Sequence, residues 1–136
     1  VTIPVHLSQA QRLYLLLTAG NAFVRYTDTA VGGVEAVCND VAYPIATLTV
    51  GQNLREWHAV GDVVVAAAPE VELVWQGALK DFPNLTGHID MLTLSLPAAC
   101  QSGTLTAVRV RDFSTETAHS RDPALNLIGL TLGYYP

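Results

Sequence analysis

The sequence contains little charge and almost no lysine. Only 14% of the 136 residues are charged, Lys80 is the only lysine, and the net charge is −5. Binding to a phosphate backbone needs clustered Lys and Arg, so we expect no nucleic-acid partner. A thinly charged surface gives a protein little protection against association. We therefore expect part of this surface to be covered by neighbouring protein.

The sequence also lacks the motifs of the common enzyme and cofactor classes. It contains no GxGxxG pattern, Walker loop, HExxH or CxxC, and no serine or cysteine stands in the glycine-framed turn typical of a nucleophile. The prediction is a protein with no catalytic residues, no cofactor site and no metal site, and hence not an enzyme.

Long apolar runs are missing too. The longest, such as residues 63–68, have the length of a strand. A membrane-spanning helix needs about eighteen or more apolar residues, so we expect no membrane insertion. The chain begins at Val1 with neither a methionine nor a basic-then-apolar leader, which fits removal of an initiator residue and removal of a signal peptide equally well. These features leave the location of the protein open.

Cysteine is scarce, with only Cys38 and Cys100 present. Two cysteines cannot complete a tetrahedral zinc site without further ligands. In an oxidising compartment, a disulfide between them would close a loop of about 60 residues and stabilise the fold by about 4 kcal/mol. In a reducing compartment, they would be two small buried apolar side chains. The sequence leaves both interpretations open.

The chain does contain the two-residue period of half-buried β-strands. Val71, Leu73 and Trp75 alternate with polar neighbours such as Glu72, and similar short segments recur between turn signals. No helical segments separate them, as βαβ units would require. We predict a mainly β fold, with one domain over residues 1–136. The expected architecture is an antiparallel β-sandwich or barrel of about seven to eight short strands.

One segment near the N-terminus fits two structures. Ser8 and, three residues later, Gln11 resemble a helix capping box, so we expect one short helix near residues 9–18. The alternative is a β-hairpin with strands over residues 13–18 and 22–27.

The first residues of the chain read as an edge strand. Val1, Ile3, Val5 and Leu7 alternate with polar residues or proline. Pro4 lacks the N–H of a ladder hydrogen bond, which places the strand at the edge of a sheet. An edge can pair with another chain, so these four apolar residues are the candidate strand-exchange segment.

Two clusters of polar residues are candidates for chemistry. Glu56, Trp57 and His58 could form a carbohydrate-binding shelf, and the competing interpretation is that Trp57 anchors the core while its neighbours face water. His88 and Asp90 would share one strand face and could act as a base with its orienting carboxylate, or as metal ligands. We expect instead a solvated face, because any two polar residues two apart on a strand share a face.

Arg109 and Arg111 form the only paired cationic feature on one strand face. They could hold a carboxylate or phosphate bidentately. The competing interpretation is surface or interface ion pairs with Asp112, Glu116 or Asp122, which lie nearby in the sequence.

Two further features lie in the C-terminal half. Tyr134 and Tyr135 are candidate interface residues, because tyrosine supplies a large rigid area with a polar tip, and a packed terminus is the alternative. Asn84-Leu85-Thr86 matches the N-glycosylation pattern, which matters only after passage through a eukaryotic secretory pathway.

These observations favour a noncatalytic structural subunit of a large assembly, with copies of itself or other proteins as partners. In size and composition, the chain is similar to small β-rich head-decoration (cement) and tail-surface proteins of tailed bacteriophages, and this resemblance implies a virion surface protein. One alternative is a secreted or surface β-sandwich that binds carbohydrate or a receptor. Another is a pilus-like filament subunit joined by strand exchange.

Overall fold

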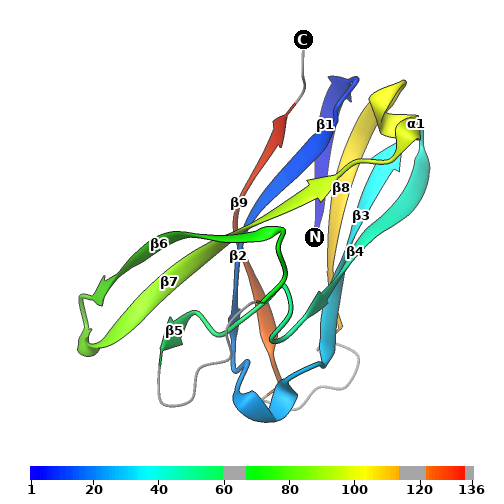
Figure 1. Cartoon of the computed structure of the whole chain (residues 1–136). Helices are drawn as coiled ribbons and strands as arrows, with labels where there is room; N and C mark the ends of the chain where they lie inside the picture. The colour runs from blue at the N-terminus through cyan, green and yellow to red at the C-terminus, as the bar shows by residue number, and fades with distance from the viewer. Residues whose placement is uncertain (60–66, 114–121, 134–136) are drawn as a thin grey trace.

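The computed structural model describes residues 1–59, 67–113 and 122–133, and it shows an antiparallel β-sandwich of two sheets (Figure 1). The first sheet has the spatial order β1 (Thr2–Ser8), β8 (Thr104–Asp112), β3 (Ala30–Cys38) and β4 (Val41–Thr49). The second has the order β5 (His58–Ala59), β7 (Phe82–Ser95), β2 (Arg12–Gly20) and β9 (Ala124–Gly133), and β6 (Val71–Leu79) also pairs with β7. The mainly β fold class is confirmed.

The core lies between the two sheets because each strand turns every second apolar side chain inward. On β2, Leu13, Leu15 and Leu17 are at most 2% exposed. Full burial of one leucine contributes roughly 1.5–3 kcal/mol. The opposing sheet supplies the buried side chains of Val34, Ala36, Leu48, Leu105, Val108 and Val110.

The helix expected near residues 9–18 is wrong. Residues 12–20 form β2, which pairs with β7 on one side and with β9 on the other. Backbone hydrogen bonding on both sides, together with the two-residue period of the leucines, outweighs the local capping pattern. The alternative hairpin is only half right, because residues 24–26 form the short 3₁₀ helix η1 (Val24–Tyr26) and not a strand.

The α-helix that the structure does contain is α1 (Ala98–Gln101), which follows Pro97 in the connection from β7 to β8. Among the described residues, no helix is long and apolar enough to cross a membrane. The apolar run at residues 63–68 lies mostly outside the described residues.

Strand β7 changes partners along its length. Its second half pairs with β2, from Asp90 opposite Leu17 to Ser95 opposite Arg12. Its first half continues with β6 as a two-stranded hairpin that projects from the sandwich (Figure 1). Where β7 leaves β2, the short strand β5 pairs with Thr86 and Gly87. The second sheet therefore ends in a hairpin without a sandwich partner on either face, as far as the described residues extend.

Strand β1 lies at the edge of the first sheet, where Pro4 predicted it. It pairs with β8, and within the described residues no strand pairs with its other side. The register shifts between Pro4 and Leu7. Ile3, Val5 and Leu7 are half-buried, and Val5 and Leu7 pack against the core of their own chain.

A disulfide joins Cys38, at the end of β3, to Cys100 in α1. Both residues are fully buried, and their Cα atoms lie 5.1 Å apart, within the usual range for a disulfide. The bond ties the first sheet to the connection that leaves the second sheet, so it links the two layers.

We predict that the purified, unreduced chain has no thiol that reacts with iodoacetamide under denaturing conditions, and that reduction exposes both. Since the bond spans 62 residues of sequence, its loss should cost about 4 kcal/mol of unfolding free energy. Mass spectrometry with and without reductant measures the first effect and urea unfolding the second. Two reactive thiols in unreduced protein would contradict the prediction.

Candidate functional site

The paired arginines of β8 face a carboxylate of the neighbouring strand. Arg109 Nη1 lies 3.7 Å from Glu35 Oε2, and Arg111 Nη1 lies 3.8 Å from Glu35 Oε1. Glu35 stands directly opposite Arg109 in the ladder between β3 and β8. Both arginine side chains are about half exposed, so these ion pairs contribute little to stability. The pair lines a shallow hollow of about 600 Å³ on the outer face of the first sheet.

The ion-pair partner expected from the sequence is corrected by this geometry. Sequence proximity favoured Asp112, Glu116 and Asp122, whereas within the described residues both arginines lie beside Glu35, which is far away in sequence but adjacent across the sheet. Asp112 instead accepts a hydrogen bond from the Leu125 amide at 3.1 Å. Glu116 lies outside the described residues.

Residues 54–59, which we call the bridging segment, fill the gap between β2 and β7. The Ala19 amide donates to the Arg55 carbonyl at 2.9 Å, and the Trp57 amide donates to the Ala19 carbonyl at 2.8 Å. On the other side, the His88 amide donates to the Trp57 carbonyl at 3.0 Å. The bridging segment therefore places Glu56, Trp57 and His58 at the point where β7 leaves β2.

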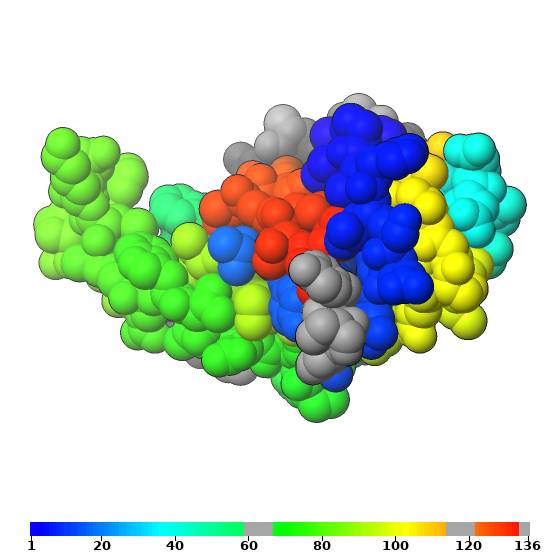
Figure 2. Space-filling view, turned by 90° about the horizontal axis from the view of Figure 1, so that it is seen from above, coloured from blue at the N-terminus to red at the C-terminus, as the bar shows by residue number. Residues whose placement is uncertain are grey.

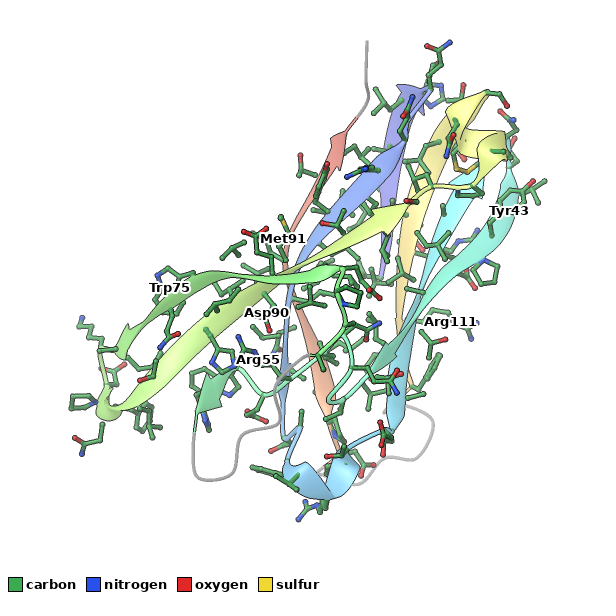
Figure 3. All side chains as sticks on the ribbon, in the orientation of Figure 1. Tyr43, Arg55, Trp75, Asp90, Met91 and Arg111 are labelled. Atoms are coloured by element: carbon green, nitrogen blue, oxygen red, sulfur yellow. A yellow bond between two sulfur atoms is a disulfide. The ribbon has the colours of Figure 1, made fainter. Side chains whose placement is uncertain are left out.

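A bidentate ion pair fastens this segment to β7. Arg55 Nε and Nη2 each lie 2.6 Å from a carboxylate oxygen of Asp90, and the two side chains are 13% and 8% exposed (Figure 3). A planar guanidinium matches the two oxygens of a carboxylate, which makes such pairs strong and directional. Asp90 is thus committed to Arg55.

Glu56 and His88 are buried beside this ion pair. Glu56 Oε2 accepts a hydrogen bond from the Ala22 amide at 2.6 Å, and His88 Nε2 contacts the Glu56 carbonyl. Burial raises the pKa of Glu56 above its ordinary value of 4.5, while the bond from Ala22 opposes that shift. Burial lowers the pKa of His88 below its ordinary value of 6.5, and the Arg55 guanidinium lowers it further.

The expectation that His88 and Asp90 form a solvated strand face is therefore wrong, because both are more than nine-tenths buried. The expectation that the neighbours of Trp57 face water fails in the same way, since Glu56 is buried and the His58 side chain is only 17% exposed. The bridging segment covers this part of β7, and no local pattern near His88 or Asp90 indicates that cover.

The buried polar cluster is engaged in contacts within the chain. Asp90 holds Arg55, Glu56 holds the Ala22 amide, and His88 contacts the Glu56 carbonyl. Within the described residues, no group of three His, Cys, Asp or Glu side chains is arranged to hold a metal ion. Through these contacts, the cluster holds the bridging segment against β7.

An apolar groove of about 450 Å³ lies on the face of the second sheet that carries Trp75. Trp75 lies over the facing glycines Gly77 and Gly87: a Cβ on Gly77 would stand 2.8 Å from its indole, and one on Gly87 3.2 Å. Glycine at both positions therefore leaves the space that the indole ring of Trp75 occupies. The groove is lined by Thr18, Trp57, Trp75, Leu79, Gly87, His88, Ile89, Asn126 and Ile128.

Sequence reasoning placed Trp75 on the same strand face as Val71 and Leu73, which is wrong. The register shifts at Val74, so that Leu73 faces Asp90 and Trp75 faces Ile89 on the opposite side of the sheet. Trp75 was missed as a site residue for this reason. The unusual strand glycine Gly77 is the one signal that could have pointed to it.

The candidate strand-exchange segment does not join this groove. Val1, Ile3, Val5 and Leu7 belong to the segment of β1, in the other sheet. Tyr134 and Tyr135 lie outside the described residues.

No family model, curated protein or solved structure matches this chain.

We predict that Asp90→Asn lowers the free energy of unfolding by about 3 kcal/mol, because it leaves the poorly exposed Arg55 guanidinium without a counter-ion. The double variant Arg55→Met/Asp90→Leu, which removes both charges, should be more stable than Asp90→Asn. Urea unfolding of the three proteins measures the effect. Equal stability of Asp90→Asn and the wild type would show that the ion pair does not hold the segment.

We predict that stability falls on acidification below about pH 6.5, because the unfolded chain protonates at the ordinary histidine pKa while folded His88 resists the proton. The loss ends below the lowered pKa of the folded state. Glu56 acts in the opposite direction: its raised pKa favours the fold below about pH 4.5, a contribution lost as the pH rises.

Thermal unfolding of the wild type and of His88→Gln over the range from neutral to about pH 5.5 isolates the histidine. The pH slope should be smaller in the variant, whatever its absolute stability. If stability depended on pH equally in the two proteins, His88 would not be the cause of the loss of stability on acidification.

Proposed function

We propose that this chain is a noncatalytic structural subunit that works through protein–protein contacts within a larger assembly. We further propose that the assembly is a virion, with the chain on its surface as a head-decoration or tail-surface protein of a bacteriophage. The observation that carries the proposal is the projecting hairpin of β6 and β7, which presents large apolar side chains to solvent.

The hairpin of β6 and β7 exposes four large apolar side chains to solvent. Leu73, Val74, Trp75 and Phe82 are each between 44% and 57% exposed. Scattered exposed apolar residues are common on monomeric proteins, whereas a concentration of them on one element marks an interaction surface. The bulge at Val74 distributes them over both faces of the hairpin, so both faces are available for contact.

The stability of the hairpin supports the same conclusion. A two-stranded hairpin is marginally stable in water and needs packing on at least one face. Within the described residues, the bridging segment covers only the base of this one, near Gly87 and His88. A neighbouring protein that covers the apolar side chains would stabilise the outer part. The low charge of the whole chain is consistent with such cover.

The groove favours a second candidate function, a β-sandwich module that binds carbohydrate or a receptor. Trp57 and Trp75 both line it, together with the polar residues Thr18 and Asn126. Aromatic side chains offer flat apolar surfaces with polar groups at the rim. Binding of the purified monomer to a glycan array, lost in Trp57→Ala, would favour this function over the assembly.

We predict that the chain in its producing culture migrates with particles in a density gradient, and that Leu73→Ser/Phe82→Ser shifts it to the free-protein fractions. Both substituted side chains are exposed, so the fold should survive. Val41→Ser, at a 53% exposed residue of the other sheet, is the matched control and should stay with the particles.

Migration of the wild-type chain with free protein would contradict the assembly. Particles without capsid or tail proteins beside the chain would contradict the virion assignment alone, because other assemblies could use the same hairpin.

A further inference from the structure

The outer edge of β9 lacks the prolines that protect the edge strands of the first sheet. The edge strands of the first sheet carry Pro4 and Pro44, and proline discourages pairing with another chain. Strand β9 has ten residues without a proline or a charge. It pairs with β2 on one side, and within the described residues no strand pairs with the other. Half of an edge strand's backbone groups turn away from its partner and stay open for pairing.

The side chains of β9 are also incompletely covered. Leucines at four positions pack against the core, yet no residue of β9 is fully buried. On the neighbouring strand, Leu13 and Leu15 are 0% exposed. Seen from above, β9 reaches the surface next to β1 (Figure 2). As far as the structure describes the chain, the sandwich is therefore open along this edge. The four leucines are Leu125, Leu127, Leu130 and Leu132.

We propose that a second copy of this chain pairs with β9 in antiparallel fashion, about a two-fold axis between Ile128 and Gly129. The second sheet would then run continuously through both protomers. This inference goes beyond the proposed function, because it uses a different edge of the sheet from the projecting hairpin.

The sequence of β9 is self-complementary about that axis. The two-fold places Leu127 opposite Leu130 of the second copy and Asn126 opposite Thr131, so apolar residues meet apolar ones and polar residues meet polar ones. A C₂ interface requires this kind of match, because each residue meets the partner's copy of the same strand.

The bulge in β9 supports the same axis. The register with β2 shifts around Ile128, so that Leu127 faces Leu17 and Gly129 faces Leu16. Leu127 and Leu130 therefore both turn toward the core side, although three positions separate them. In the proposed pair, the 51% exposed Ile128 would lie opposite Gly129 of the second copy, where no side chain obstructs it.

Sedimentation of the purified chain over a wide concentration range tests the pairing, with a reversible dimer expected. Ile128→Lys and Ile128→Glu each bring two like charges together near the axis and should weaken self-association at least about tenfold. An equimolar mixture of the two variants should recover the dimer, because the charges are then opposite. Val41→Lys, at an exposed apolar residue of β4, should dimerise like the wild type.

Cross-linking tests the register. In Asn126→Cys/Thr131→Cys, each new cysteine faces one of the second copy, at a spacing suited to a disulfide. The two cysteines of one chain are five residues apart on a strand, about 16 Å, and cannot join each other. Oxidation should give a covalent dimer, in higher yield than for Thr131→Cys alone.

A wild-type chain that stays monomeric at every concentration would overturn the proposal. A dimer that Ile128→Lys leaves intact would overturn it as well, and so would a dimer that the double cysteine variant fails to cross-link. Loss of particle binding in the hairpin variant with an intact dimer would separate this inference from the proposed function.

Discussion

The ion pair between Arg55 and Asp90 is the contact on which the shape of the second sheet depends. Strand β7 shares a ladder with β2 only as far as Asp90, and beyond that residue it needs another neighbour. The bridging segment supplies one, and Arg55 holds it there through two hydrogen bonds of 2.6 Å. A poorly exposed charge is costly without its partner. Arg55 and Asp90 therefore fix the point at which the hairpin leaves the sandwich.

In the part of the chain that the structure describes, the second sheet has two uncovered ends, on opposite sides of β2. On the β7 side, the hairpin carries exposed Leu73, Trp75 and Phe82. On the other side, β9 carries leucines that the core covers only in part. The first sheet differs, because its edge strands contain Pro4 and Pro44 and its outer face carries ion pairs. Among the described residues, the two surfaces that we propose for protein contacts therefore both belong to the second sheet.

Local patterns predicted the strands well where the period of apolar residues was clear, and failed where it competed with another signal. Residues 9–18 combine a capping pattern with alternating leucines, and pairing on both sides of β2 decided for the strand. The polar character of His88 and Asp90 suggested a solvated surface. Their burial comes from a segment more than 30 residues away in sequence, which no local pattern can reveal.

Composition, a two-residue period and one proline were enough to predict the mainly β class, the edge position of β1 and the scarcity of surface charge, while they left sandwich and barrel both open. The choice of sandwich over barrel, and the residues that meet, depend on the folded chain: Glu35 lies beside the arginines of β8, Arg55 pairs with Asp90, and Trp75 packs on two glycines. Strand order and the bulge at Val74 set those contacts, and both arise from pairing between distant segments. A one-residue shift in register turns a side chain to the opposite face, so the candidate site could be assigned only from the folded chain.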